Sequence, residues 1–196
     1  MTSTTLPFRC RCGEVRGTLA DLQPTSGIRV VCHCRSCRTW AERLDRADLL
    51  DAAGGTDLVQ TAPSRLRFET GHEALRCVKL TEKGVLRWFT ACCRTPIANT
   101  PDTPSVPIMG FFVGILGGEP HTLQRVLGPV RYRLQGADAV GTPPPGTKKA
   151  FSTRHMLQAS LLMLRFQLTR RVRPTPFFDD AGRPVAPILK DPSEAA

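Results

Sequence analysis

Residues 32–37 read Cys-His-Cys-Arg-Ser-Cys and place three thiols within six positions. They follow a β-prone run, so residues 28–34 predict a strand that leads into the cluster. If the chain turns after Cys34, then Cys32, Cys34 and Cys37 can bind one ion, and no other Cys or His follows at short range. Three protein ligands with an open fourth position are typical of a catalytic zinc site. The alternative is a structural site that a distant residue closes.

Two further pairs of cysteines predict a second zinc site. Cys10 and Cys12 form a C-x-C pair, whose side chains share one face of an extended strand. Cys92 and Cys93 are adjacent, and the following Thr95-Pro96 predicts a turn that lets both reach one ion. Together these four thiols would close a zinc site that joins the N-terminal strand to the middle of a sheet. We therefore expect two zinc ions per chain.

Two other side chains near these clusters have alternative interpretations. Cys77 lies in a β-prone stretch and is expected to be a small buried hydrophobe, with ligation at either site as the alternative. His33 stands between two ligand cysteines, so in an extended segment its ring should point away from the metal. It can orient a ligand, contact substrate or pack in the core. The other histidines are not assigned to a metal.

The composition indicates a globular protein with many turns and a basic surface. The chain has 196 residues, of which 41% are apolar, 17 are Pro and 16 are Gly. Its 27 basic and 17 acidic residues give a net charge of +10, which can attract nucleic acid, an anionic membrane or an anionic metabolite.

Neither a targeting segment nor a membrane span is expected. The first residues lack the layout of a signal peptide, and the most apolar stretch, residues 156–168, is too short and too polar to span a bilayer. We therefore expect a cytoplasmic location and no membrane partner. Eight cysteines in that reducing compartment favour metal binding or catalysis over disulfides.

The pattern along the chain predicts a mainly β protein with a C-terminal helix. We expect a helix over residues 40–53 and strands over residues 57–61, 65–69, 75–80, 85–90, 107–116 and near 121–134. The expected organisation is a zinc-binding domain over residues 1–140, a Pro-rich break over 141–148, and a helix with an irregular tail over 149–196.

The C-terminal helix carries an apolar stripe whose partner the sequence leaves open. The stripe recurs at helical spacing and consists of Leu157, Leu161, Leu164 and Leu168. We expect it to cover the sheet of its own chain. The alternative is a homodimer formed through this helix, and the oligomeric state stays undetermined at this point.

Three motifs together resemble a known family. Residues 10–13 (Cys-Arg-Cys-Gly), residues 32–38 (Cys-His-Cys-Arg-Ser-Cys-Arg) and residues 87–96 (Arg-Trp-Phe-Thr-Ala-Cys-Cys-Arg-Thr-Pro) are similar in order and spacing to the glutathione-dependent formaldehyde-activating enzyme (GFA) family. That family includes centromere-protein-V-like (CENP-V) proteins, and the similarity covers roughly residues 8–115. The resemblance implies an Mss4-like β-rich fold with a structural zinc site and a second site to which family enzymes direct a glutathione adduct.

The sequence departs from the family pattern at the structural site. The family closes this site with C-x-x-C-G, whereas Thr90 stands here at the first Cys position and Arg94 at the Gly position. Cys93 matches the second Cys, and Cys92 would have to shift register to serve as the other. The chain also extends beyond the usual domain after Pro144, which indicates a divergent subfamily.

Two classes of function follow from these observations. The first is a zinc-dependent carbon–sulfur lyase acting on the adduct of an aldehyde with glutathione or another small thiol, with Cys32, Cys34 and Cys37 as its catalytic ligands. No general base can be named for it. The alternative is a non-catalytic, zinc-stabilised module that binds nucleic acid or a protein. Few aromatic residues are interleaved with the basic ones, so a base-stacking platform is not favoured.

Overall fold

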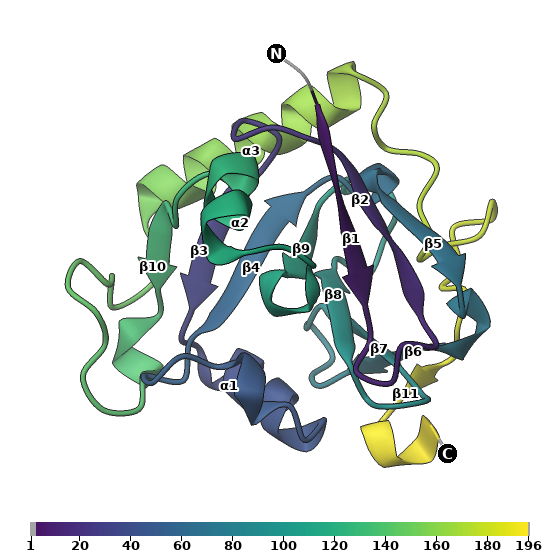
Figure 1. Ribbon diagram of the computed structural model, residues 1–196, viewed down its shortest axis with the longest axis horizontal. Coiled ribbons are helices and arrows are strands. Elements are labelled where there is room, and N and C mark those ends of the chain that lie inside the picture. Colours follow the sequence, from purple (N-terminus) through teal and green to yellow (C-terminus); the bar gives the residue numbers. More distant parts are fainter. Residues whose placement is uncertain (1–2, 196) are drawn as a thin grey trace.

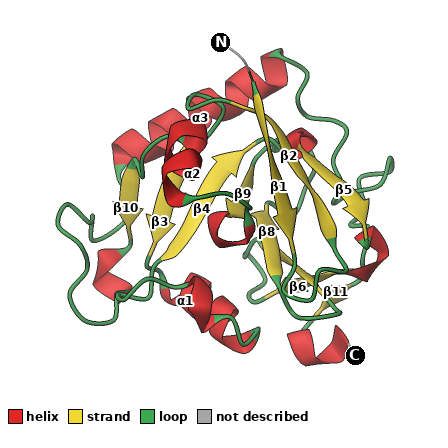
Figure 2. Ribbon diagram, in the orientation of Figure 1, coloured by secondary structure: helices red, strands yellow, loops and turns green. Residues whose placement is uncertain are grey.

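The computed structural model describes residues 3–195, and within them eleven strands form two sheets (Figure 1). The smaller sheet has the order β1-β2-β5 and consists of β1 (Thr4–Arg9), β2 (Arg16–Leu22) and β5 (Leu66–Thr70). Both pairings in it are antiparallel. The mainly β class with a C-terminal helix is therefore confirmed (Figure 2).

The larger sheet has eight strands, and two short strands from the last third of the chain form its edges. Its order is β10 (Tyr132–Leu134), β3 (Ile28–Cys32), β4 (Thr56–Thr61), β9 (Met109–Phe112), β8 (Pro96–Thr100), β7 (Leu86–Thr90), β6 (Leu75–Lys79) and β11 (Ile188–Leu189). The inner pairings are antiparallel, whereas β10 and β11 pair in parallel with β3 and β6. The C-terminal tail thus contributes an edge strand to the sheet.

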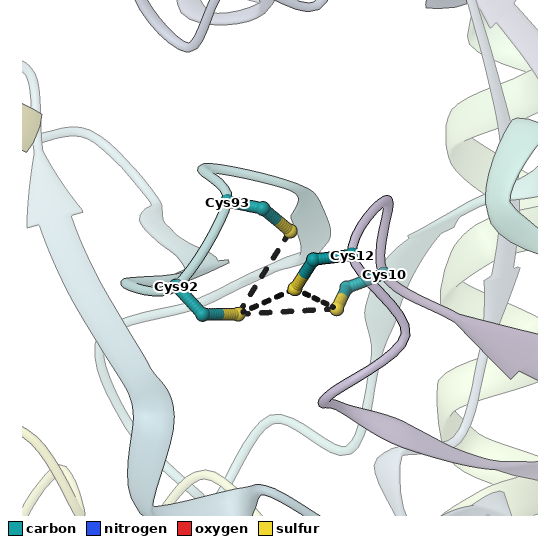
Figure 3. Close-up of side chains that lie close together, drawn as sticks. All are labelled: Cys10, Cys12, Cys92 and Cys93. Atoms are coloured by element: carbon teal, nitrogen blue, oxygen red, sulfur yellow. Dashed lines mark hydrogen bonds between the residues drawn. The ribbon is translucent and has the colours of Figure 1, made fainter.

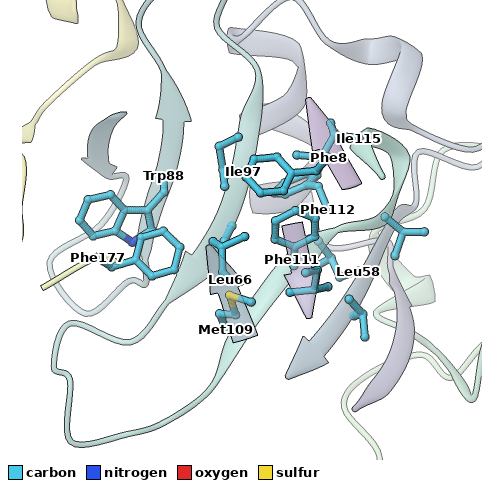
Figure 4. Packing of buried hydrophobic residues seen from close by; sticks show 14 of the residues in the cluster. Phe8, Leu58, Leu66, Trp88, Ile97, Met109, Phe111, Phe112, Ile115 and Phe177 are labelled. Carbon is cyan, nitrogen blue, oxygen red and sulfur yellow. The ribbon is translucent and has the colours of Figure 1, made fainter. Parts of the chain in front are cut away.

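Aromatic side chains join the two sheets and fix the tail to the core (Figure 4). Phe8 of the smaller sheet lies edge-on to Phe111 of the larger one, with ring centroids 5.5 Å apart. On the other side, Trp88 packs at 4.9 Å against Phe177 of the tail, and both side chains are fully buried. Such pairs add about 0.5–1.5 kcal/mol beyond the burial of their area.

The predicted strands over 57–61, 65–69, 75–80 and 85–90 correspond to β4, β5, β6 and β7. Two other predictions are wrong. Helix α1 is Arg35–Arg43 rather than residues 40–53, because the side chain of Cys34 caps it and begins it earlier. Residues 121–134 contain a helix, α2 (Pro120–Leu127), before β10, since Pro at the first helical position favours a helix start.

The predicted C-terminal helix is present as α3 (Thr153–Leu168), but its Leu stripe does not cover the sheet. Leu157, Leu161, Leu164 and Leu168 are 62, 56, 50 and 76% exposed. The face turned toward the protein instead carries Leu162 and Phe166, which lie about half a turn away from the stripe. The expectation of intramolecular packing is therefore wrong.

The helices of the structure can be compared with the requirements for a membrane-spanning segment. Among the described residues, no helix combines the length and the apolar character needed to cross a membrane.

Candidate metal centres

Two groups of cysteines have their sulfur atoms gathered within 4.8 Å of one another in the described part of the chain. One contains Cys10, Cys12, Cys92 and Cys93, and the other contains Cys32, Cys34 and Cys37. All seven cysteines that the sequence proposed as ligands therefore lie in the two expected groups. All eight cysteines of the chain are free thiols.

The sulfurs of the four-cysteine group point toward one another from two turns that are about 80 residues apart in sequence, and Cys12 and Cys92 remain exposed (Figure 3). The sulfur of Cys92 lies 3.9 Å from that of Cys10, 3.4 Å from that of Cys12 and 3.8 Å from that of Cys93. The sulfurs of Cys10 and Cys12 are 3.5 Å apart. Four sulfurs bound at 2.3 Å in a tetrahedron lie about 3.8 Å from one another. The spacing of this group fits a tetrahedral zinc ion.

A tight turn after β1 presents Cys10 and Cys12. Gly13 has a φ of +83°, a conformation that favours glycine, and its N–H donates to the carbonyl of Cys10. The N–H of Val15 donates to the sulfur of Cys10 at 3.3 Å. This backbone donor stabilises a thiolate at Cys10 in a position that is 1% exposed.

The turn after β7 brings Cys92 and Cys93 to one side although they are adjacent in sequence. Arg94 adopts a left-handed φ of 54°, and its N–H donates to the carbonyl of Thr90. The hydroxyl of Thr90 accepts from the N–H of Thr95 at 3.1 Å and lies 3.5 Å from the sulfur of Cys93. Thr90 and Arg94 stand where the GFA pattern has Cys and Gly, and here both shape the turn.

Burial and neighbouring donors set the protonation of this group. Burial raises the pKa of Cys10 and of Cys92. Burial also acts on Cys93, but hydrogen bonds from the hydroxyl of Thr95 and the N–H of Cys12 outweigh it and lower the pKa of Cys93 to about 6. These donors therefore favour the thiolate form of Cys93, which is the form that binds zinc.

The three-cysteine group sits where β3 ends and α1 begins. Cys34 is the N-cap of α1, and its sulfur accepts from the N–H of Cys37 at 3.3 Å. Cys32 and Cys37 are each 7% exposed, whereas Cys34 is more open to solvent. The turn that the sequence required after Cys34 is thus the first turn of a helix, whose N-terminal N–H groups favour negative charge.

A buried arginine from β7 supports the three-cysteine group. Arg87 is 5% exposed, and its Nη2 donates to the hydroxyl of Ser36 in the C-x-x-C turn at 2.7 Å. Its Nη1 donates to the side chain of Asn99, and its guanidinium lies 5.9 Å from the ring of Trp40. Arg87 thereby fixes the turn and places one positive charge beside three thiols.

The three thiols share their protons unequally. Hydrogen bonds from Cys32 and then Cys37 lower the pKa of Cys34 to about 2, and the charge of Arg87 contributes in the same direction. The hydrogen bonds to Cys34 and Cys37, together with burial, raise the pKa of Cys32. Within the group, Cys34 therefore favours the thiolate form more than Cys32 does.

The structure also places the two residues whose interpretation was open. The ring of His33 is fully buried and turned away from the cysteines, with Nδ1 3.3 Å from the carbonyl oxygen of Leu134 and Nε2 3.4 Å from Asp51. Cys77 is fully buried in β6, outside both cysteine groups, and burial raises its pKa to about 12. Cys77 therefore has the packing role expected of it, and His33, held by Leu134 and Asp51, does not belong to either cysteine group.

Several residues around the sites were not identified from the sequence. Arg46 is 6% exposed, and its Nη1 donates to the hydroxyl of Thr95 at 2.9 Å. Arg87 and Thr95 lie within the motif of residues 87–96, and membership of that motif was the only feature of the sequence that could have identified them. Arg46 stands outside every motif, so nothing in the sequence marked it.

Comparisons with known proteins place the chain in a family. Among curated proteins, none matches this sequence. One solved structure, described as that of a Rhodobacter sphaeroides protein, is 22% identical to it over a match covering 61% of this chain and 96% of that chain, with a TM-score of 0.41. The model of a family of unknown function, DUF6151, matches residues 2–189. The chain therefore belongs to the DUF6151 family.

Proposed function

We propose that the protein binds two zinc ions per chain, one in a closed site and one in a site with an open coordination position. The observation that carries the proposal is the close spacing of the sulfurs in the four-cysteine group: four of the six separations are 3.4–3.9 Å and all are within 4.8 Å, against the roughly 3.8 Å of a tetrahedral zinc thiolate site. With four thiolates from two distant turns, this ion would stabilise the fold.

The three-cysteine group supplies one ligand fewer. Cys32, Cys34 and Cys37 leave one tetrahedral position for a small molecule. A zinc ion bound there supplies a Lewis acid for a thiol or hydroxyl group. Three thiolates donate much negative charge, which favours binding of a thiol over activation of water. Arg87 offsets part of that charge and holds the turn through Ser36.

The proposed activity is that of a carbon–sulfur lyase on a thiol–aldehyde adduct, as in the GFA family that the motifs resemble. In the forward direction the thiolate sulfur attacks the aldehyde carbon, the carbon–sulfur bond forms, and the alkoxide takes a proton from solvent. In the reverse direction the hydroxyl loses its proton, the bond breaks and the thiolate leaves. Glutathione is the proposed thiol, and a zinc-binding fold of the Mss4-like type is part of the same proposal.

Cobalt substitution tests both sites in one protein. Co²⁺ bound to thiolates absorbs strongly, so two ions per chain are expected to give additive spectra. Cys12→Ser should remove the component of the closed site, and Cys34→Ser that of the open site. Added glutathione should perturb the spectrum of Cys12→Ser, which retains the open site, but not that of Cys34→Ser.

Thiol–aldehyde exchange is then measured on the zinc protein. Exchange of formaldehyde with glutathione should be faster with the native protein than with Cys34→Ser, whereas buffer alone provides the uncatalysed rate. If only one cobalt ion binds and Cys34→Ser does not change its spectrum, the open site is refuted. If both ions bind and no thiol perturbs either spectrum, the zinc sites stand and the enzymatic proposal fails.

A further inference from the structure

A polar pocket of about 350 Å³ lies far from both cysteine groups, where the end of β2 meets the last turn of α3. Its charged lining consists of Asp21, Arg65, Arg165 and Arg171. In the β1–β2 pairing, Thr4 lies opposite Leu22, whereas Arg9, next to Cys10, lies opposite Arg16. The pocket and the four-cysteine group are therefore at opposite ends of this hairpin, about 20 Å apart along the strands.

Arg65 projects from a short 3-10 turn, η2 (Pro63–Arg65), and is only 6% exposed. Its Nη1 donates to the backbone carbonyls of Ala20 and Asp21. Its Nε is buried and has no hydrogen-bond partner among residues 3–195. Burial, followed by the charges of Arg171 and Arg165, lowers the pKa of Arg65 to about 10. The three guanidinium groups are thus close enough to repel one another.

The end of α3 is built so that two more arginines reach the same pocket. The N–H of Arg170 donates to the carbonyl of Gln167, and the N–H of Arg171 donates to that of Phe166. Arg170 has a left-handed φ of 54°, so the helix ends in a Schellman motif. This turn directs the chain back toward β2, where Arg171 pairs with Asp21 at 3.1 Å. Arg165 enters from the preceding helical turn.

The charges in the pocket do not balance. Three guanidinium groups face one carboxylate, which leaves a net charge of +2 on the lining. We propose that this pocket binds the dianion of a phosphate group, either as inorganic phosphate or as a phosphate monoester. Guanidinium groups match phosphate oxygens in geometry and charge. A phosphodiester carries a single charge and would leave part of the repulsion uncompensated.

Calorimetric titration at pH 8 and constant ionic strength tests the assignment with three probes: inorganic phosphate, phenyl phosphate and dimethyl phosphate. Inorganic phosphate and phenyl phosphate are expected to bind, and dimethyl phosphate to bind at least about tenfold more weakly, since it offers one charge instead of two. Whichever of the first two probes binds more tightly identifies the ligand as free inorganic phosphate or as a phosphate monoester.

Two substitutions on α3 distinguish binding in the pocket from nonspecific attraction of anions to the basic surface. Arg165→Gln changes an exposed side chain and should weaken phosphate binding by about tenfold or more, because a charge-assisted hydrogen bond is lost. Arg154→Gln removes the same charge from the same helix outside the pocket and should leave binding unchanged. Equal effects of the two variants, or equal binding of dimethyl phosphate, would overturn the proposal. The zinc sites are untouched by either result.

Discussion

The hydroxyl oxygen of Thr95 lies 3.2 Å from the sulfur of Cys93 and connects the four-cysteine group to the rest of the molecule. The same oxygen accepts from the N–H of Arg11, between Cys10 and Cys12, at 3.0 Å and from Nη1 of Arg46 at 2.9 Å. With one donor and two acceptor positions in use, this hydroxyl is saturated. Thr95 therefore joins the two cysteine turns.

Replacing Thr95 by Val should weaken zinc binding at the four-cysteine group. The substitution keeps the shape but removes the donor to Cys93, whose pKa should rise, and it also removes the acceptor of Nη1 of Arg46. Loss of such outer-sphere partners typically costs about 10- to 100-fold in metal affinity. Competition with a chromophoric chelator measures the zinc affinity. The matched control is Thr142→Val, the same substitution at an exposed position. Equal affinity in the two variants would show that Thr95 only packs.

The position of Thr90 predicts that a cysteine placed there can replace Cys92 as a metal ligand. Its hydroxyl lies 3.5 Å from the sulfur of Cys93, on the same turn as Cys92. Cys92→Ala should therefore lose one thiolate ligand, and Thr90→Cys combined with Cys92→Ala should restore four. The expected readout is recovery of the thiolate–cobalt absorption intensity in the double variant. The result would contradict the geometry if the double variant bound cobalt no better than Cys92→Ala alone.

The three-cysteine group was predictable from sequence because its members lie in one short motif with local geometry. The four-cysteine group joins two motifs about 80 residues apart, and its pairing was predicted because neither pair alone supplies four zinc ligands. The strands were predictable from local patterns, since β-prone runs alternate with turns. The contact of Arg46 with Thr95 spans 49 residues and depends on how α1 docks onto β7 and β8. The orientation of α3 was not predictable either, because the helix is apolar on two faces and only packing decides which face is buried.

The two faces of α3 should differ sharply in their contribution to stability. Leu162→Ala removes a side chain that is 9% exposed and should lower the free energy of unfolding by about 2–5 kcal/mol. Leu161→Ala, the same substitution one position away at a 56% exposed site, should change it by less than about 0.5 kcal/mol. Urea unfolding of the zinc-loaded protein compares them. Equal losses, together with a dimer in sedimentation, would show that a second copy covers the Leu stripe.

His155 should make stability depend on pH below neutrality. The ring lies on the buried face of α3, its Nε2 is 2.8 Å from the side-chain oxygen of Gln60, and burial lowers its pKa. The unfolded chain therefore binds a proton at about pH 6.5, where the folded protein does not. Stability is fully present above that pH and is lost as the pH falls below it, with a slope of at most about 1.4 kcal/mol per pH unit.

A substitution that does not titrate isolates this contribution. His155→Gln can keep a hydrogen bond to Gln60 and should show a smaller difference in the free energy of unfolding between pH 7.5 and 5.5 than the native protein. Thiol protonation affects both proteins alike, so the difference between their slopes belongs to His155. His121→Gln, at an exposed position on α2, is the matched control and should follow the native curve. A native-like slope in His155→Gln would mean that protonation of this ring is tolerated in the fold.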